Sequence, residues 1–497
     1  MNKPCKPRVK GTPSFRFALE SSILLIASAT CASAATQYWS GAGTWGTGTN
    51  WSNASGGPYT VVWANTTADV AVFEGTAGTV AIATNRNVDQ LNFNVTGYSL
   101  TAATPVTLTG AGPTGVTLAS GVTASIGSNI TVQSSTTAQN WTLSSTSKSS
   151  VLDVSGTIKN ATANNSTITG TTVNVKAGGL LQSNNSLLIG GTAVGADLNL
   201  DGGKLEMSNT TGVTNLIVNN TAAITSSSTL TFGAGSELTW ANAANTGGIR
   251  FGGGSTNALT QLTGTINVNG GVVTTNKIYM GGSYTGGATY TATVNLNGGT
   301  LRAAQSQAQF LEGITSAKVQ AGGAIFDSNN FNITVAQALV ADSASGGLEK
   351  KGQGTLSLSG SNTYTGDTLV NNGTLALSST GGLKFLVGAN NVSNKIGGTG
   401  TVSIDGLFTF DLTSASTLVN SSWNIVDVAN LNESFGANFG IAGFTADGGG
   451  LLWNGSANGT NYQFSEATGV LSVVPEPAAA VLGGFGMLTL LRRRRQA

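Results

Sequence analysis

Hydrophobic and polar residues alternate over most of the chain between residues 35 and 474. The alternation recurs in short segments such as 106–108, 198–200 and 294–296, where Val or Leu flank a Thr or an Asn. Gly, Asn or Ser follows each segment within a few residues, which is typical of a short strand with one buried face and a turn after it. Because no window here shows the 3.6-residue period of an amphipathic helix, the pattern predicts an all-β body.

A short motif that recurs along the chain bears on the architecture. Residues 199–205, Asn-Leu-Asp-Gly-Gly-Lys-Leu, return at 295–301 as Asn-Leu-Asn-Gly-Gly-Thr-Leu. Short strands that repeat with glycine corners suit a parallel β-solenoid, in which each coil satisfies the backbone of the next. We expect coils of about 20 to 25 residues. A row of separate β-sandwiches is the competing interpretation, and longer strands with more varied cores would favour it.

The first 34 residues are patterned differently from the body. Five basic residues lie between positions 3 and 16, an apolar stretch covers 23–27, and Ala32-Ser33-Ala34 follows. This order is typical of a secretory signal peptide, so we expect residues 1–34 to form a signal helix that signal peptidase removes after Ala34. Lipidation at Cys31 is the weaker alternative, because Thr30 stands where a smaller residue is expected.

The last residues, 474–497, also predict a membrane segment. They consist of a short Pro-containing segment, an uncharged stretch and a basic cluster: Val474, Pro475, Glu476 and Pro477, then 478–491, then Arg492, Arg493, Arg494 and Arg495. The uncharged stretch is short against the roughly 20 residues of a spanning helix. Arginines placed directly after it nevertheless follow the positive-inside rule. We therefore expect a C-terminal transmembrane helix, and a buried helix of the fold is the alternative.

This ending resembles the PEP-CTERM sorting signal, in which a Pro-Glu-Pro tripeptide, a short spanning segment and an arginine cluster follow one another. The resemblance covers residues 474–497. It implies that an exosortase-type membrane protease is a partner and that cleavage occurs near the tripeptide. The protein would then be anchored in the inner membrane before processing, and would reach the cell surface or the extracellular space afterwards.

Residues 346–377 carry the most distinctive sequence of the body. A Gly-Gly-Leu start and the pair Lys350-Lys351 are followed by Gly-Gln-Gly-Thr-Leu-Ser-Leu, by Asn-Thr-Tyr-Thr-Gly at 362–366 and by Asn-Gly-Thr-Leu at 372–375. The segment is similar to the autotransporter-associated β-strand repeat, which implies a surface passenger built as a right-handed β-helix. We expect Lys350-Lys351 to be a solvated turn, 362–366 to be a turn with Tyr364 capping one layer, and six residues to face the interior: Leu356, Leu358, Leu369, Val370, Leu375 and Leu377.

Aromatic residues gather on both flanks of the expected solenoid. Residues 35–79 hold Trp39, Trp45, Trp51 and Trp63, and we expect them to form an N-terminal cap that shields the first coil. Stacking of these rings on sugars is the alternative. Degenerate coils are expected over 80–345, and a second aromatic β cap over 378–473.

The amino-acid composition and the charge exclude several classes of active site and of binding partner. Of 497 residues, 70 are glycine and only 9% are charged, and there is no histidine. Both cysteines, Cys5 and Cys31, lie in the expected leader, which excludes thiol nucleophiles, His-based triads, structural zinc sites and disulfides from the exported body. Between residues 35 and 474 there are 13 Lys and Arg against 19 Asp and Glu. Because no basic stripe exists, no nucleic-acid partner is expected.

No motif for a cofactor or metal is present. The glycine loops at 252–255 and 397–400 lack a following Lys-Ser/Thr, and acidic residues such as Asp197, Asp201 and Asp405 stand singly. We therefore expect no cofactor, no metal and no catalysis, and an exported structural or adhesin-like protein of the cell surface or extracellular matrix, with extracellular polysaccharide as a further contact. Carboxylates clustered beside Arg or Lys would instead favour a polysaccharide-cleaving β-helix enzyme, and a row of exposed Trp and Tyr would favour a carbohydrate-binding module.

Overall fold

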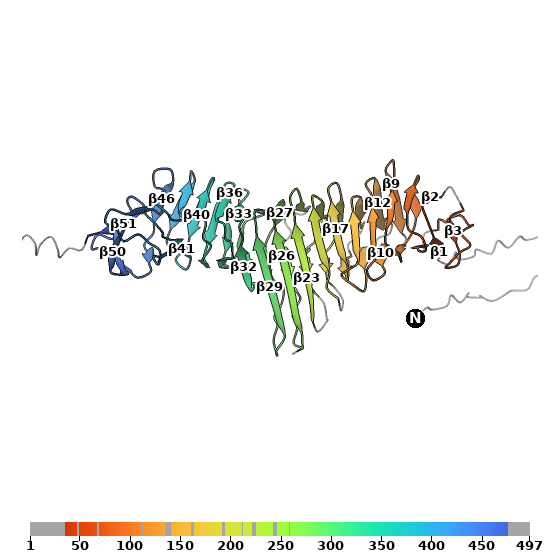
Figure 1. Ribbon diagram of the computed structural model, residues 1–497, viewed down its shortest axis with the longest axis horizontal. Helices are drawn as coiled ribbons and strands as arrows, with labels where there is room; N and C mark the ends of the chain where they lie inside the picture. Colours follow the sequence, from red (N-terminus) through yellow and green to blue (C-terminus); the bar gives the residue numbers. More distant parts are fainter. Residues whose placement is uncertain are drawn as a thin grey trace, which may run out of the picture. The chain divides into compact units, whose positions relative to one another are not determined.

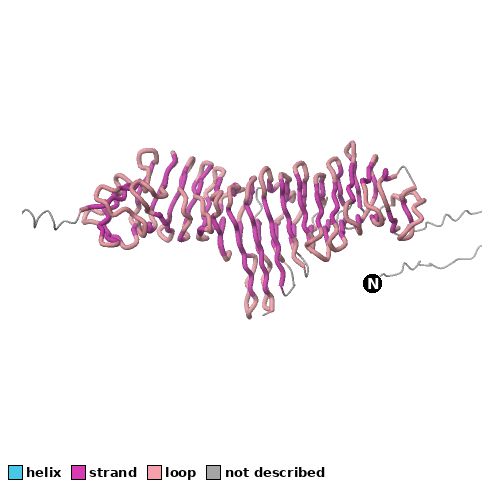
Figure 2. The backbone as a smooth tube through the Cα atoms, viewed as in Figure 1, coloured by secondary structure: helices cyan, strands magenta, loops and turns pink. Residues whose placement is uncertain are grey.

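The computed structural model describes residues 35–475 apart from short gaps at 47–48, 67–68, 111–113, 135–140, 161–163, 191–193, 211, 221–224, 242–245 and 258. These described residues form strands, turns and loops without any helix (Figure 2), which confirms the all-β prediction. The expected signal helix and the expected transmembrane helix, apart from Val474 and Pro475, lie outside the described residues. Within the described ranges, no helix has the length and apolar character needed to cross a membrane.

Three long parallel sheets make up the body (Figure 1). In sheet 1, each strand pairs with the strand three positions later in the chain, in the order β2 (Gly43–Trp45), β5 (Thr79–Ile82), β8 (Tyr98–Thr101), β11 (Thr123–Ile126), β14 (Val151–Val154), β17 (Thr172–Lys176), β20 (Asp197–Asp201), β23 (Thr225–Phe232), β26 (Gln261–Val268), β29 (Thr289–Leu296), β32 (Ser316–Val319) and β35 (Leu339–Ala341).

Sheet 2 follows the same rule of pairing with the strand three positions later. Its strands are β6 (Arg86–Asn87), β9 (Val106–Gly110), β12 (Ile130–Ser134), β15 (Thr157–Lys159), β18 (Leu180–Ser183), β21 (Lys204–Met207), β24 (Glu237–Trp240), β27 (Val272–Thr275), β30 (Thr300–Ala303), β33 (Ala324–Asp327), β36 (Leu348–Lys351), β39 (Thr368–Val370) and β42 (Ile396–Gly398).

Sheet 3 completes each coil. It contains β1 (Thr36–Trp39), β3 (Trp51–Ser52), β4 (Val70–Phe73), β7 (Gln90–Phe93), β10 (Thr114–Leu118), β13 (Trp141–Ser144), β16 (Ser166–Thr169), β19 (Leu187–Ile189), β22 (Leu216–Val218), β25 (Ile249–Phe251), β28 (Ile278–Met280), β31 (Gln307–Glu312), β34 (Ile333–Val335), β37 (Thr355–Leu358), β40 (Thr374–Leu377), β43 (Thr401–Ile404) and β46 (Asn432–Phe435). One strand from each sheet in turn makes one coil, which is the arrangement of a β-helix.

The core is a set of apolar rows that run from coil to coil. In sheet 1, Leu198 pairs with Leu230, and the same row continues through Ile266 and Val294. All four side chains are fully buried, whereas the adjacent polar row points outward. Because successive side chains alternate between faces, this register places every Leu, Ile and Val of the row inside the coil.

The recurring Gly-Gly motif has a defined steric role. Gly202 and Gly298 adopt positive φ angles of 77° and 88°, a conformation that glycine enters at little cost. A Cβ on the next glycine would lie 2.5 Å from the Val175 carbonyl oxygen at Gly203, and 2.5 Å from the Gly270 carbonyl oxygen at Gly299. The first glycine therefore makes the corner, and the second lets the neighbouring coil approach.

The aromatic residues of the N-terminal flank are buried in the first coils. Trp39, Trp45 and Trp51 are fully buried and Trp63 nearly so, and the Trp51 and Trp63 rings lie 4.5 Å apart. Strand β3 pairs antiparallel with β1, so Trp51 stands opposite Trp39. These rings are buried against one another in edge-to-face and tilted contacts, so their faces are not available to stack on a sugar.

The other end carries two smaller sheets. Sheet 4 is parallel and contains β38 (Ser361–Asn362), β41 (Gly382–Leu386), β44 (Leu407–Asp411) and β47 (Gly440–Ile441). Sheet 5 is antiparallel and contains β45 (Ser422–Asn424), β51 (Val470–Val474), β50 (Thr460–Ser465), β49 (Leu452–Ala457) and β48 (Phe444–Ala446). Phe464 of β50 packs against Phe408 and Phe439, with ring centroids 6.2 Å apart in both pairs, and so joins the two sheets.

Two expectations for the repeat at 346–377 are wrong. Leu369 is 39% exposed, because Thr368 and Val370 on either side of it take the inward positions of β39. Lys350 is not in a solvated turn: it lies in β36 with its side chain buried among neighbouring coils. Tyr364 is buried, and its hydroxyl lies 2.6 Å from the Thr368 hydroxyl.

Candidate functional site

The residues predicted to direct sorting lie at the last described point of the chain. Val474 ends β51 and pairs with Asn461 of β50. Pro475 follows directly and is exposed. The other predicted sorting and processing residues lie outside the described residues: Ala32, Ala34, Glu476, Pro477, Arg492, Arg493, Arg494 and Arg495.

The outer face of sheet 1 is the most regular polar surface of the body. One outward row consists of amide and hydroxyl side chains that hydrogen-bond from coil to coil. The Asn174 amide donates to Asp153 at 2.8 Å and the Asn199 amide donates to Asn174 at 3.0 Å. Two further links continue the row, from Asn267 to the Thr231 hydroxyl at 3.3 Å and from Asn295 to Asn267 at 2.8 Å. Such side-chain ladders hold neighbouring strands in register.

Three strands of this sheet are longer than their neighbours. Strands β23, β26 and β29 have eight residues each, against five in β20 and four in β32. Figure 1 shows them extending beyond the other strands. Among the described contacts, no protein partner holds the hydroxyls of four threonines on the outer side of this extension, so these hydroxyls face solvent: Thr263, Thr265, Thr291 and Thr293.

A small core of its own supports the extension from beneath. Leu262 and Tyr290 are buried on the inner side of β26 and β29, and the Tyr290 ring lies 5.2 Å from Tyr284 and 6.1 Å from Phe251. The Tyr290 hydroxyl donates to the Val218 carbonyl oxygen at 2.6 Å. Burial raises the pKa of Tyr290, so this hydroxyl stays a hydrogen-bond donor at physiological pH.

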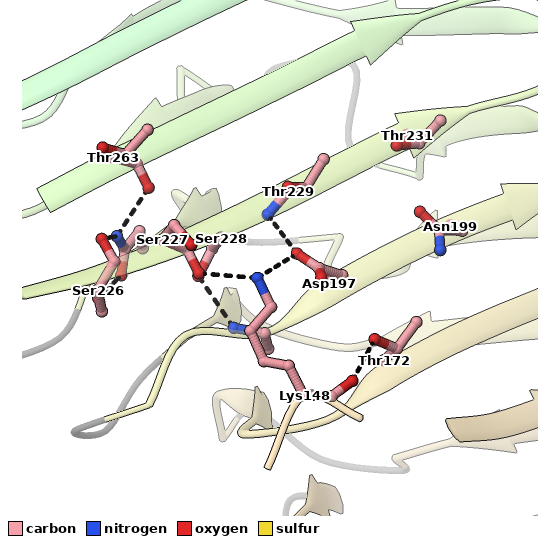
Figure 3. A network of polar contacts seen from close by, with 12 residues as sticks. Lys148, Thr172, Asp197, Asn199, Ser226, Ser227, Ser228, Thr229, Thr231 and Thr263 are labelled. Carbon is pink, nitrogen blue, oxygen red and sulfur yellow. Dashed lines mark hydrogen bonds and ion pairs between the residues drawn. The ribbon is translucent and has the colours of Figure 1, made fainter. Parts of the chain in front are cut away.

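A lysine braces the base of the extension (Figure 3). Lys148 Nζ lies 2.7 Å from Asp197 Oδ1 and donates to the Ser227 carbonyl oxygen at 3.1 Å. The same carboxylate oxygen accepts from the Thr229 backbone N–H at 3.0 Å. Since the ammonium and the carboxylate are both engaged in holding β23 against β20, the network offers no unpaired base or nucleophile for chemistry.

A second lysine, Lys350, is held inside the repeat segment. Its Nζ donates to the Ser328 hydroxyl at 2.8 Å and to the carbonyl oxygens of Lys351, Gly352 and Asn372 at 2.9, 2.7 and 3.1 Å. Burial lowers the pKa of Lys350 to about 8. The alternation pattern contained one signal for this site, because Lys350 stands two residues after the inward Leu348.

The single carboxylates of the body are matched across coils. Asp201 pairs with Lys176 at 3.3 Å and Asp327 with Arg302 at 2.8 Å. Side-chain and backbone hydrogen bonds from Asn438 lower the pKa of Asp405. Within the described ranges, no group of three or more acidic, His or Cys side chains could hold a metal ion, and no Trp, Tyr or Phe is more than partly exposed. The described surface therefore presents no row of exposed aromatic rings, the feature that would favour a carbohydrate-binding module.

Comparison with known proteins points to autotransporter passengers. The family model described as the passenger-associated-transport-repeat matches residues 348–377, which confirms the repeat predicted from the sequence. The adhesin BmaC autotransporter of Brucella suis biovar 1 (strain 1330) is 36% identical over 123 residues, which cover 22% of this chain and 4% of that protein. The chain therefore spans a small fraction of the length of this relative.

Proposed function

We propose that this chain is an exported, adhesin-like surface protein whose right-handed β-helix serves a structural role without catalysis. The passenger-associated repeat at 348–377 carries the proposal, because it lies within the parallel ladders of sheets 2 and 3 rather than in a separate domain. The similarity to an autotransporter adhesin supports the same conclusion. The outer rows of Thr and Asn, in which charged side chains are paired across coils, suit a scaffold better than an active site.

The proposal includes delivery by the two ends of the chain. Signal peptidase would remove residues 1–34, and an exosortase-type protease would act on the segment that begins with Val474, Pro475, Glu476 and Pro477. Supporting this, Pro475 is exposed directly after β51, so the first residue of the tripeptide is accessible. The protein would be held in the inner membrane before processing and released to the surface or the matrix afterwards.

Intact-mass measurement of the protein recovered from separate cell fractions tests this delivery. We expect the surface form to lack both the leader through Ala34 and the last twenty-odd residues. We expect the membrane form to retain those C-terminal residues. A variant with Pro475, Glu476 and Pro477 replaced by Ala should accumulate in the membrane fraction. Full-length tails in surface material would contradict the sorting proposal.

Binding of a neutral extracellular polysaccharide is the second candidate function, and the solvent-facing hydroxyls on β26 and β29 favour it. A double variant, Thr263→Val with Thr291→Val, removes two hydroxyls and keeps the shape of the side chains. We expect reduced co-sedimentation with an insoluble neutral glucan. The matched control replaces Thr142 and Thr167, which form an outward pair on sheet 3. Equal losses in both variants would rule out a site on the extension.

A further inference from the structure

Exposed aliphatic side chains are concentrated in the C-terminal part of the described chain. Ten large hydrophobic residues are exposed in the described ranges, and six of them lie between residues 386 and 451. Three of these six stand on two neighbouring turns: Leu418 is 73% exposed, Val392 is 59% exposed and Val419 is 54% exposed. We call these three residues the apolar turn patch.

Backbone hydrogen bonds place the two turns side by side. Ser421 N–H donates to the Leu418 carbonyl oxygen at 3.0 Å, which closes the first turn. Val392 N–H donates to Ala389 at 2.9 Å, which closes the second. The turn that contains Val392 is joined to β45, the strand that follows the turn at Leu418, because Asn391 N–H donates to the Ser422 carbonyl oxygen at 2.9 Å.

The same turns adjoin the end of β51. Val473 N–H donates to the Ser421 carbonyl oxygen at 2.9 Å, and Ser472 pairs with Ser422. Val473 is two residues before Pro475, the last described residue, so the patch lies at the end of sheet 5 that holds this residue. Only Glu476 and Pro477 separate Pro475 from the uncharged stretch 478–491, a reach of roughly 10 Å in extended chain.

The charge around the patch fits an apolar partner. Residues 385–394 and 412–426 contain no Lys, Arg, Asp or Glu. The nearest charges on either side are paired, Lys384 with Asp411 at 2.9 Å and Lys395 with Asp427 at 4.0 Å. The hydrogen bond from Lys384 lowers the pKa of Asp411 to about 2, so this carboxylate stays ionised and paired at a membrane surface.

We propose that Val392, Leu418 and Val419 insert into the interfacial region of the phospholipid bilayer while the chain is anchored, so that the C-terminal cap rests on the membrane. This inference rests on the membrane anchoring proposed above. Aliphatic side chains bury readily at the boundary between headgroups and acyl chains. Three side chains give weak binding alone, but an anchor that begins three residues after Pro475 holds them at high effective concentration. Loss of the anchor would then release the cap.

Site-specific fluorescence in proteoliposomes tests the proposal. The full chain, with Cys5 and Cys31 replaced by Ser, is reconstituted into vesicles of phosphatidylethanolamine and phosphatidylglycerol at 3:1. An environment-sensitive fluorophore is attached at Leu418→Cys or, as the matched control, at Leu259→Cys, which is a 62% exposed aliphatic position between β25 and β26. We expect a blue-shifted emission and at least threefold stronger quenching by spin-labelled lipid at position 418 than at position 259.

The outcomes separate the two proposals. If the chain floats with the vesicles and the probe at 418 is quenched no more than the probe at 259, anchoring stands and membrane insertion of the patch is overturned. If the chain does not float with the vesicles, anchoring itself fails and the patch proposal falls with it. A second variant carrying Val419→Asp and Val392→Asp should abolish the quenching at 418 while flotation is unchanged.

Discussion

Lys350 occupies an inward position of β36, in a core that is otherwise almost entirely apolar. Its ammonium group donates to the carbonyl oxygens of Lys351 and Gly352 in its own coil, to the Ser328 hydroxyl of the preceding coil and to the Asn372 carbonyl oxygen of the next. A buried charge is tolerated only when it is well hydrogen-bonded, and here the ammonium group donates to three carbonyl oxygens, of which that of Lys351 also accepts from the Ser328 N–H at 3.0 Å. At the residue scale, this lysine therefore acts as an internal clamp between successive coils of the repeat.

Replacement of this clamp should be costly. Lys350→Met keeps the length of the side chain but leaves the carbonyl oxygens of Lys351, Gly352 and Asn372 without this donor. We expect a loss of at least about 2 kcal/mol in local stability, measured as faster amide exchange in β36, β39 and β40. The matched variant Lys351→Met breaks a partly exposed pair with Glu349 at 3.2 Å and should cost less than about 1 kcal/mol. Equal costs would argue against an internal clamp.

The same residue predicts a pH dependence of stability. The pKa of Lys350 is about 8 in the folded chain, against roughly 10.4 for an unfolded lysine. Between these values the unfolded chain binds more protons, so the free energy of unfolding should rise with pH. In urea titrations, the difference between wild type and Lys350→Met should increase by about 1–3 kcal/mol from pH 8 to pH 10. Tyrosine titration near pH 10 is shared by both proteins and drops out of this difference, and a flat difference would contradict the low pKa.

At the scale of strands and corners, the Gly-Gly motif joins one coil to the next. Gly299 precedes β30, and a Cβ at this position would lie 2.5 Å from the Gly270 carbonyl oxygen and 2.6 Å from Val268 Cγ1. Both atoms belong to the preceding coil, so neither can retreat without moving a ladder strand. The motif at 199–205 meets the same limit at Gly203, which explains why the two copies share both glycines while Asp and Asn interchange.

Gly299→Ala should therefore destabilise the chain by about 1–3 kcal/mol through overpacking. A matched control is Gly448→Ala, because a Cβ there meets nothing within 4 Å and the backbone has no positive φ. That control should be neutral or stabilise by up to about 1 kcal/mol through the unfolded chain. Thermal unfolding followed by circular dichroism compares the two, and a Gly299→Ala protein as stable as the Gly448→Ala protein would refute the steric argument.

The alternation of hydrophobic and polar residues predicted the buried rows, but it did not predict for every strand which of the two alternating positions faces inward. Leu198 and Leu200 flank Asn199, so only one phase buries both leucines, and that phase is the observed one. In Thr368-Leu369-Val370 two apolar residues are adjacent, and the phase was set by pairing with β36, which turned Leu369 outward. The clamp by Lys350 depends on Ser328 and Asn372 of other coils, and the extension of β23, β26 and β29 depends on Phe251 of the preceding coil. Neither could be inferred from local pattern.

At the scale of the whole described body, stability comes from contacts between neighbouring coils. Each strand of sheets 1 and 2 pairs mainly with the strands three positions before and after it. In such an array, stability is close to a sum of coil and nearest-neighbour terms. One coil is therefore a removable unit, provided that the coils on either side meet in the same register.

The register identifies such a unit. Gln261 pairs with Thr289, Val273 pairs with Leu301, and both pairs are 28 residues apart and share the same burial. Deletion of residues 261–288 joins Thr260 to Thr289, which places Tyr290 where Leu262 was and keeps apolar residues inside.

We expect this deletion protein to be soluble, to retain its β-type circular dichroism and to unfold cooperatively. Deletion of residues 261–274 removes half of the same coil and brings β28, a strand of sheet 3, into a position of sheet 1, so it should aggregate or lose cooperative unfolding. Size-exclusion chromatography and thermal melts compare the two proteins. A folded half-coil deletion beside an unfolded full-coil deletion would be incompatible with stacked coils, because only the whole coil restores the pairing of every strand on both sides.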